Sequence, residues 1–221
     1  MILTISSSIV FPTQIVSATK SSFLSIKDLT EQKLREEKLD AEIRAEAKKL
    51  AAIEKERKLA AIEEAKKLAA IEKERSAIVT YINTRYYISK RAADKILSLV
   101  EESATAYKIP KTLILAVIAK ESKFNPYAGS NANAEGLMQV IARCHPEKMK
   151  AIGGESNIVQ AKGNIIAGTR VLREYLDGCG GGLVCALQTY NGAQDDPLAL
   201  YADRVLTERS NIERYLKLHK T

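Results

Sequence analysis

Apolar residues in the second half of the chain recur three and four positions apart, which is the spacing of helices that bury one face. Ser89 and Pro110 suit helix starts, and Gly178 suits a helix end. The predicted helices cover residues 90–107, 110 to about 124, about 159–177, 183–190, and a closing helix from about 197 onwards. The pattern predicts an all-α domain over residues 89–221.

A long charged helix is predicted ahead of this domain, over residues 31–76. This segment contains no Gly or Pro, so helix propensity is high throughout. A Leu-Ala-Ala-Ile motif recurs every nine residues from Leu50, Leu59 and Leu68. Nine residues make about two and a half turns, so these leucines fall alternately on opposite sides. The repeat therefore does not favour a standard two-stranded coiled coil.

Charge pairs can support such a helix in water. Glu54 with Lys58 and Glu63 with Lys67 are spaced four apart in the favoured order. Residues 31–76 hold 13 basic and 12 acidic residues, so the segment is nearly neutral. Two interpretations stay open: a solvated helical arm over residues 31–88 with a linker at 19–30, or a surface whose apolar edges bind an envelope protein partner.

The first 18 residues predict export. They are largely apolar and end in Val16, Ser17 and Ala18, small enough for a signal peptidase. A short disordered tail is the alternative, because no Lys or Arg precedes the apolar run. No stretch approaches the roughly 20 apolar residues of a spanning helix. We expect an exported protein of the periplasm or cell envelope, without a stable transmembrane span.

Glu121 stands out because it ends an apolar helical stripe. Ile114, Val117 and Ile118 share its face, by the i, i+3, i+4, i+7 spacing. Partial burial and the negative end of the helix dipole both disfavour the charged form. The sequence therefore predicts a raised pKa for Glu121, beside a loop at 127–135 that is rich in Gly, Ser, Asn and Ala.

Several short blocks resemble the soluble lytic transglycosylase (SLT) domain, which is related in fold to goose-type lysozyme. They are Glu121-Ser122, Asn125-Pro126, the run from Gly136 to Gln139, Tyr190-Asn191-Gly192 and a later Tyr201. They follow the family's order over roughly the last 130 residues. The resemblance implies a helical lysozyme-like fold whose substrate is the glycan strand of bacterial peptidoglycan.

The resemblance also implies the roles of individual residues. Glu121 would be the catalytic residue, first as acid and then as base, and Ser122 would orient its carboxylate or the sugar. The product would be a 1,6-anhydromuramoyl sugar, formed without water. The substrate-binding residues would be Ser122, Gly136, Leu137, Met138, Gln139, Tyr190, Asn191 and Tyr201. Tyr201 also suits the core face of the closing helix.

Two other functions stay open. A goose-type muramidase would need a second carboxylate, for which Glu135 and Asp195 are the candidates. A non-catalytic cell-wall-binding module would keep the fold without turnover. Where many family members have a Pro-x-Thr turn after the glutamine, this chain has Arg143-Cys144-His145, so the far wall of the cleft is expected to differ.

Cysteines and charge narrow the remaining possibilities. Cys179 and Cys185 can form a disulfide in an exported protein, with buried free thiols as the alternative. Asn164 and Gly168 suit packing positions as well as ligands. No spacing matches a metal motif, so we expect no metal and no cofactor.

Residues 77–221 hold 19 basic and 14 acidic residues, and this net positive charge suits binding to anionic wall polymers. The basic residues are scattered and match no nucleic-acid motif, which argues against a nucleic-acid partner.

Overall fold

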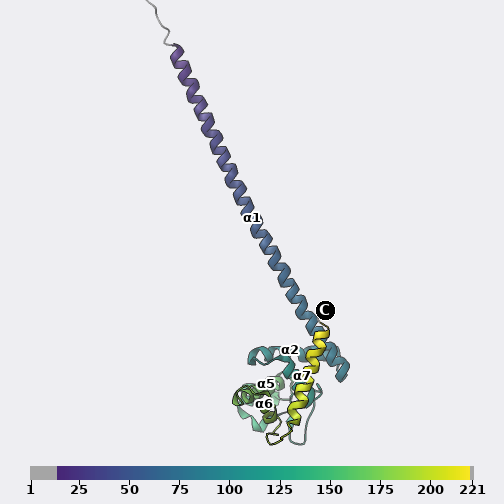
Figure 1. Ribbon diagram of the computed structural model, residues 1–221. Coiled ribbons are helices and arrows are strands. Elements are labelled where there is room, and N and C mark those ends of the chain that lie inside the picture. The colour runs from purple at the N-terminus through teal and green to yellow at the C-terminus, as the bar shows by residue number, and fades with distance from the viewer. Residues whose placement is uncertain (1–13, 220–221) are drawn as a thin grey trace, which may run out of the picture. The chain divides into compact units, whose positions relative to one another are not determined.

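The protein is described by a computed structural model that covers residues 14–219, with side chains from residue 26 onward (Figure 1). Most of the predicted signal peptide lies outside these residues. Within them the chain forms seven α helices and one two-stranded antiparallel sheet. The helices are α1 (Gln14–Tyr86), α2 (Lys90–Tyr107), α3 (Lys111–Glu121), α4 (Pro146–Ala151), α5 (Ala161–Gly178), α6 (Leu183–Tyr190) and α7 (Leu200–Leu218). The strands are β1 (Ala134–Glu135) and β2 (Val140–Ile141), with Ala134 opposite Ile141.

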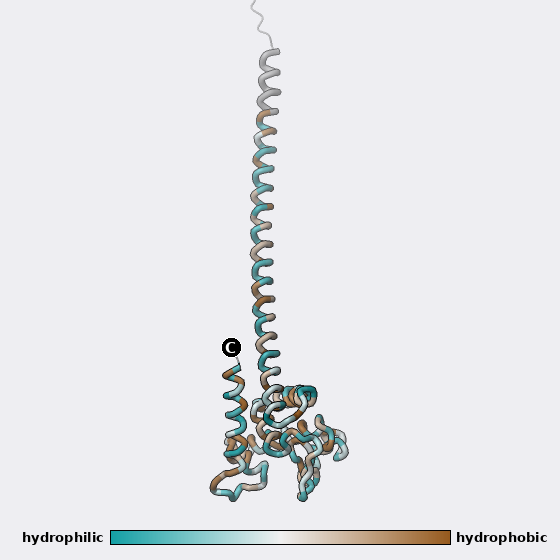
Figure 2. Tube along the Cα trace, turned by 90° about the vertical axis from the view of Figure 1, so that its right-hand side faces the viewer, coloured by the Kyte–Doolittle hydropathy of each residue, from teal (hydrophilic) through white to brown (hydrophobic). Residues whose placement is uncertain are grey.

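The chain divides into two units, Met1–Ala65 and Lys66–Thr221. The first is described only as helix, and every side chain from residue 26 to residue 65 is exposed. Leu50 and Leu59 of the nine-residue repeat are 60% and 58% exposed. Glu54 pairs with Lys58 at 2.7 Å. Polar and apolar residues interleave along this helix in Figure 2, as expected of a helix surrounded by water.

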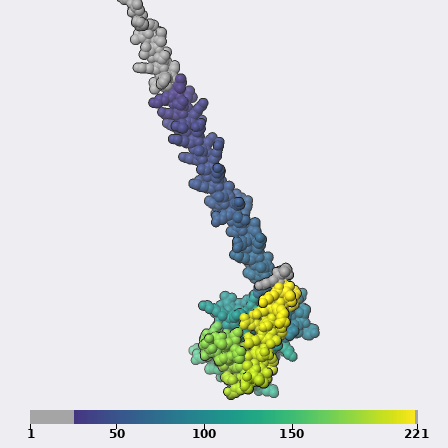
Figure 3. All heavy atoms as spheres, viewed as in Figure 1, coloured from purple at the N-terminus to yellow at the C-terminus, as the bar shows by residue number. Residues whose placement is uncertain are grey.

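The second unit is built around α3. Its residues from Leu113 to Ala119 are all buried, because α3 is enclosed by other helices. α3 packs on α7 and α2, while α5 packs on α2 and α6. Figure 3 shows α7 in yellow beside the green residues of α5 and α6. This packing fixes the C-terminal end of α3, where Glu121 lies.

The last turns of α1 belong to the core of this second unit. Ile78, Val79, Tyr81 and Ile82 are buried. The change at residue 76 from charged to β-branched and aromatic residues therefore marks where α1 becomes buried, within a continuous helix. The domain boundary was predicted near residue 89, and the hydrophobic core extends upstream of it.

Several helix ends follow local signals. α2 begins after Ser89, whose Oγ accepts a hydrogen bond from the Ala92 N–H at 3.3 Å. α7 begins at Leu200, later than the predicted start at Pro197. The reason is local: the Asp196 carboxylate accepts hydrogen bonds from the N–H groups of Leu198 and Leu200, which holds a turn ahead of the helix. The sheet was not predicted, because two-residue strands are too short to show alternation.

Candidate active site

Glu121 is the last residue of α3, at the end of its buried stretch. The helix ends there, ahead of Pro126, because Lys123 and Phe124 adopt left-handed backbone conformations with φ of 52° and 64°. The Glu121 side chain is partly buried. A carboxylate is thus held at the rim of the apolar core, as the stripe of apolar residues predicts.

The Glu121 carboxylate has a specific neighbour on α7. The Tyr201 hydroxyl donates a hydrogen bond to Oε1 of Glu121, and Tyr201 is only 5% exposed. Burial raises the pKa of Glu121 and outweighs the lowering by the Tyr201 hydrogen bond and the Arg204 charge. Lys120 does not act on it, since its Nζ lies 3.4 Å from Oε2 of Glu208. Glu121 is therefore biased toward the protonated acid.

Ser122 ties the end of α3 to the next loop. Its hydroxyl is hydrogen-bonded to the carbonyls of Leu137 at 2.8 Å and Ile118 at 3.1 Å. The side chain is buried and makes no hydrogen bond with the Glu121 carboxylate. The structure thus differs from the predicted role: Ser122 positions the loop, because its hydroxyl is already engaged with backbone.

Asn164 of α5 holds the loop from Glu135 to Met138. Its Oδ1 accepts from the Met138 N–H at 2.7 Å, and its Nδ2 donates to the carbonyls of Glu135 at 2.7 Å and Ile158 at 3.0 Å. Gly136 has φ of +76°, and a Cβ there would lie 2.3 Å from Nδ2 of Asn164. Glycine is thus required by packing against Asn164. The hydrogen bonds of Asn164 hold the loop, so of the two roles that the sequence left open, packing position or ligand, the structure favours the packing position.

Leu137 and Met138 are fully buried, at 0% exposure. The substrate contacts predicted for them are therefore not available to their side chains. Met138 packs closely against Gly168, where an added Cβ would lie 2.6 Å from Cβ of Met138. Its carbonyl accepts a hydrogen bond from the Tyr190 hydroxyl at 2.8 Å. Leu137 and Met138, like the buried Gly136, therefore support the site by packing and by backbone contacts.

Gln139, Tyr190 and Asn191 meet at a hollow of about 220 Å³. The Nε2 of Gln139 donates to the carbonyls of Ala128 at 2.9 Å and Gly136 at 3.0 Å. The pKa of Tyr190 is raised by burial and by the charge of Glu121, so this wall of the hollow lies within electrostatic reach of the acid. Its other wall includes Tyr175 of α5 together with Cys144 and His145, which belong to the segment expected from the sequence to shape the far wall differently.

No second carboxylate is coupled to Glu121 among the described residues. Glu135 is partly buried on β1 and Asp195 is exposed. Within residues 14–219, the charged side chain that perturbs the pKa of Glu121 is that of Arg204. A pair of carboxylates 5–9 Å apart, as in ordinary glycosidases, would act on one another strongly.

Sequence reasoning missed the buried carboxylate of Glu208, which is 0% exposed. It accepts hydrogen bonds from the hydroxyls of Tyr81 at 2.7 Å and Tyr86 at 2.6 Å, and lies 3.3 Å from the Arg85 guanidinium. A signal was present, since Glu208 continues the stripe of Tyr201 and the buried residues of α7 at helical spacing. Arg204 was also missed, because a lone arginine carries no motif.

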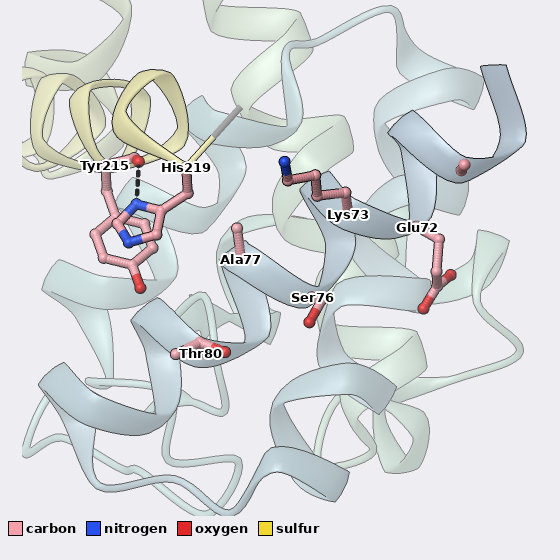
Figure 4. Close-up of a pocket in the computed structure, with 8 residues that line it drawn as sticks. Glu72, Lys73, Ser76, Ala77, Thr80, Tyr215 and His219 are labelled. Carbon is pink, nitrogen blue, oxygen red and sulfur yellow. Dashed lines mark hydrogen bonds between the residues drawn. The ribbon is translucent and has the colours of Figure 1, made fainter. Parts of the chain in front are cut away.

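Two features lie apart from this site. Cys179 and Cys185 form a disulfide, whereas Cys144, in the wall of the hollow at Gln139, is free and exposed. A larger hollow of about 580 Å³ lies between α1 and α7 (Figure 4). There the rings of Tyr215 and His219 stack with centroids 3.9 Å apart. None of the predicted site residues lines it.

Comparisons with known proteins address the same part of the chain. The family model described as Transglycosylase SLT domain matches residues 98–197. The membrane-bound lytic murein transglycosylase C of Yersinia enterocolitica is 36% identical over 129 residues, covering 52% of this chain and 36% of that protein. The protein of the same name from Sodalis glossinidius is 33% identical over 129 residues, with the same coverage. The chain thus spans about a third of the length of these curated relatives.

Solved structures share the fold. An inactive mutant of the lytic transglycosylase Slt from Pseudomonas aeruginosa aligns with a TM-score of 0.52 at 18% identity, covering 62% of this chain and 26% of that one. The 70 kDa soluble lytic transglycosylase of Escherichia coli gives a TM-score of 0.50 at 18% identity, covering 62% and 30%. Sequence and fold agree on this part of the chain: residues 98–197 match the Transglycosylase SLT domain, and the helical fold is shared with solved lytic transglycosylases.

Proposed function

We propose that this protein is a peptidoglycan lytic transglycosylase that cleaves the β-1,4 bond between N-acetylmuramic acid and N-acetylglucosamine. The observation that carries the proposal is the single carboxyl group of Glu121. It is raised in pKa by burial and hydrogen-bonded by Tyr201, with no second carboxylate acting on it. Such a group suits a reaction in which one residue both gives and takes a proton.

In the first step Glu121 is the general acid. Its raised pKa favours the protonated form, and the proton passes to the glycosidic oxygen as the bond to C1 of the muramoyl sugar breaks. Tyr201 occupies Oε1, which leaves Oε2 to carry the proton. The same Tyr201 hydrogen bond stabilises the carboxylate that remains.

In the second step the ionised Glu121 is the base. It takes the proton from the C6 hydroxyl of the muramoyl sugar, and the C6 oxygen bonds to C1. The product is a 1,6-anhydro ring, and no water is consumed. The hollow at Gln139, Tyr190 and Asn191 includes Tyr190, whose pKa responds to the charge of Glu121, and it would hold the neighbouring sugar and its acetamido group.

A goose-type muramidase is the alternative. It would activate a water with a second carboxylate several ångströms from the acid. Neither Glu135 nor Asp195 perturbs the pKa of Glu121, which favours the one-carboxylate reaction.

The test is mass spectrometry of purified sacculi digested by the full chain. We expect anhydromuropeptides from the wild type and from Glu135→Gln, and no soluble product from Glu121→Gln. Reducing ends that disappear in Glu135→Gln or Asp195→Asn would identify a muramidase. Binding to sacculi without soluble product from the wild type would identify a non-catalytic wall-binding module.

We further propose that the protein acts in the cell envelope, with residues 31–76 as a helical spacer. Its curated relatives are named membrane-bound lytic murein transglycosylases, and residues 1–18 predict export. Among the described residues, no helix has the length and apolar character needed to cross a bilayer. Fractionation of cells that express the tagged full chain tests the location. Recovery in the cytosolic fraction would contradict it.

A further inference from the structure

A third hollow, of about 500 Å³, lies between the end of α1 and the last turn of α3. It is lined by Arg85, Tyr86, Tyr87, Ala119, Lys120 and Lys123. We call it the Arg85–Lys123 hollow. Three of its six residues are cationic, and two are tyrosines. None of them belongs to the proposed active site, and Glu121 does not line the hollow although it follows Lys120 in the chain.

The fold accounts for only part of this positive charge. The Arg85 guanidinium and the Lys120 ammonium lie 3.3 Å and 3.4 Å from the buried Glu208 carboxylate. Burial alone would raise the pKa of Glu208, but hydrogen bonds from Tyr86 and Tyr81 and the charges of its two cations lower it, so it stays ionised. Three cations against one carboxylate leave a surplus of two positive charges.

Lys123 carries the part of this surplus that has no structural role. Its side chain is exposed, and no described residue forms a hydrogen bond or ion pair with its ammonium group. Its backbone is left-handed, with φ of 52°, a conformation that is unfavourable for a long side chain. The fold thus presents a free ammonium group at the rim of the hollow.

Tyr87 adds an aromatic surface to the same rim. It is 91% exposed, and its backbone is also left-handed, with φ of 59°. A tyrosine ring offers a flat apolar face with a polar tip, against which the C–H face of a sugar ring can pack. Cations beside it would pair with carboxylates on that sugar.

We propose that the Arg85–Lys123 hollow binds an anionic glycan, with a sugar ring on Tyr87 and its carboxylates on Lys123, Lys120 and Arg85. The site lies apart from the hollow at Gln139 and Tyr190. It goes beyond the proposed function, because it holds a strand without cutting it. The proposed glycan site does not depend on catalysis, because it is compatible with a glycosidase and with a catalytically inert wall-binding protein.

The test is calorimetric titration of the full chain with oligogalacturonate, a carboxylate-bearing glycan, at low salt. The variants are Tyr87→Asn, Lys123→Asn and the double variant, because asparagine tolerates left-handed backbone and leaves the contacts of Glu208 intact. Lys95→Gln on α2 is the matched control, since it removes one exposed charge outside the hollow. Thermal melting verifies that each variant is folded.

We expect Lys123→Asn to weaken binding about fivefold, the upper range for one exposed charge pair. The double variant should weaken binding about tenfold and Lys95→Gln by less than about twofold. The differences should shrink at 0.5 M salt. The proposal would be overturned if the double variant and Lys95→Gln bound oligogalacturonate with equal affinity. It would also be overturned if the wild type bound neutral maltohexaose as tightly as oligogalacturonate. The assignment to a glycan would be overturned if oligoglutamate bound as tightly as oligogalacturonate and Tyr87→Asn left both affinities unchanged. Oligogalacturonate is not a peptidoglycan substrate, so the result is independent of turnover.

Discussion

Replacing Asn164 by alanine should destabilise the second unit by about 3 kcal/mol. The Asn164 amide makes three hydrogen bonds in a buried environment, to the backbone of Met138, Glu135 and Ile158. Each such bond contributes about 1 kcal/mol net, and its loss leaves a buried backbone group without a partner. Because these bonds hold the loop beneath Tyr190, activity should fall together with stability.

Differential scanning calorimetry of the full chain measures the effect. For a unit of this size, about 3 kcal/mol corresponds to a fall in Tm of about 6–12 °C. Asn131→Ala, at an exposed position in the same loop region, is the control and should stay within about 0.5 kcal/mol of the wild type. A loss below 1 kcal/mol in Asn164→Ala would refute the reasoning.

A double-mutant cycle with Gly136 sharpens this test. In the wild type, Gly136→Ala brings its Cβ to 2.3 Å from Nδ2 of Asn164 and keeps a φ of +76°. In the Asn164→Ala background the collision disappears, and only the backbone strain of about 1 kcal/mol remains. The cost of Gly136→Ala should therefore be smaller in that background. Additive costs would show that the two residues do not restrain one another.

Other predictions concern the titrating groups. Tyr201→Phe removes a donor that lowers the pKa of Glu121, so the basic limb of the pH–rate profile should move to higher pH; an unchanged profile would contradict the assigned hydrogen bond. Burial raises the folded-state pKa of Glu121, so the protonated side chain stabilises the folded protein below about pH 4. This stabilisation is lost as the pH rises through the folded-state pKa. Glu121→Gln should therefore melt above the wild type at pH 8, and this advantage should vanish below about pH 4. Glu208→Gln should cost about 3 kcal/mol in guanidinium unfolding, whereas Glu213→Gln, on the same helix and 40% exposed, should cost less than about 1 kcal/mol; equal costs would contradict the buried role of Glu208.

Local signals in the sequence were enough to predict much of the second unit. α2 and α6 have the expected bounds, because Ser89 and the apolar spacing act within a few residues. The partial burial of Glu121 followed from its place on an apolar stripe. The left-handed residues Lys123 and Phe124, which end α3 early, could not be predicted, since neither residue type favours that conformation.

The contacts that link distant segments could not be read from the sequence. Glu208 receives hydrogen bonds from residues that precede it by 88 to 127 positions. The pairing of Asn164 with the loop at 135–138 depends on how α5 docks. The substrate roles implied for Leu137 and Met138 reflect the same difficulty, because a motif fixes which residues occur together and not which of them reach the surface.

The continuity of α1 with the core has a practical consequence for anyone preparing the second unit alone. A recombinant fragment that starts at residue 89 would lack Ile78, Tyr81 and Ile82 and would strip Glu208 of both its tyrosine donors and of Arg85. Such a fragment should be recovered as insoluble material. A fragment that starts at Lys66 retains all of these contacts and is the shorter chain to express.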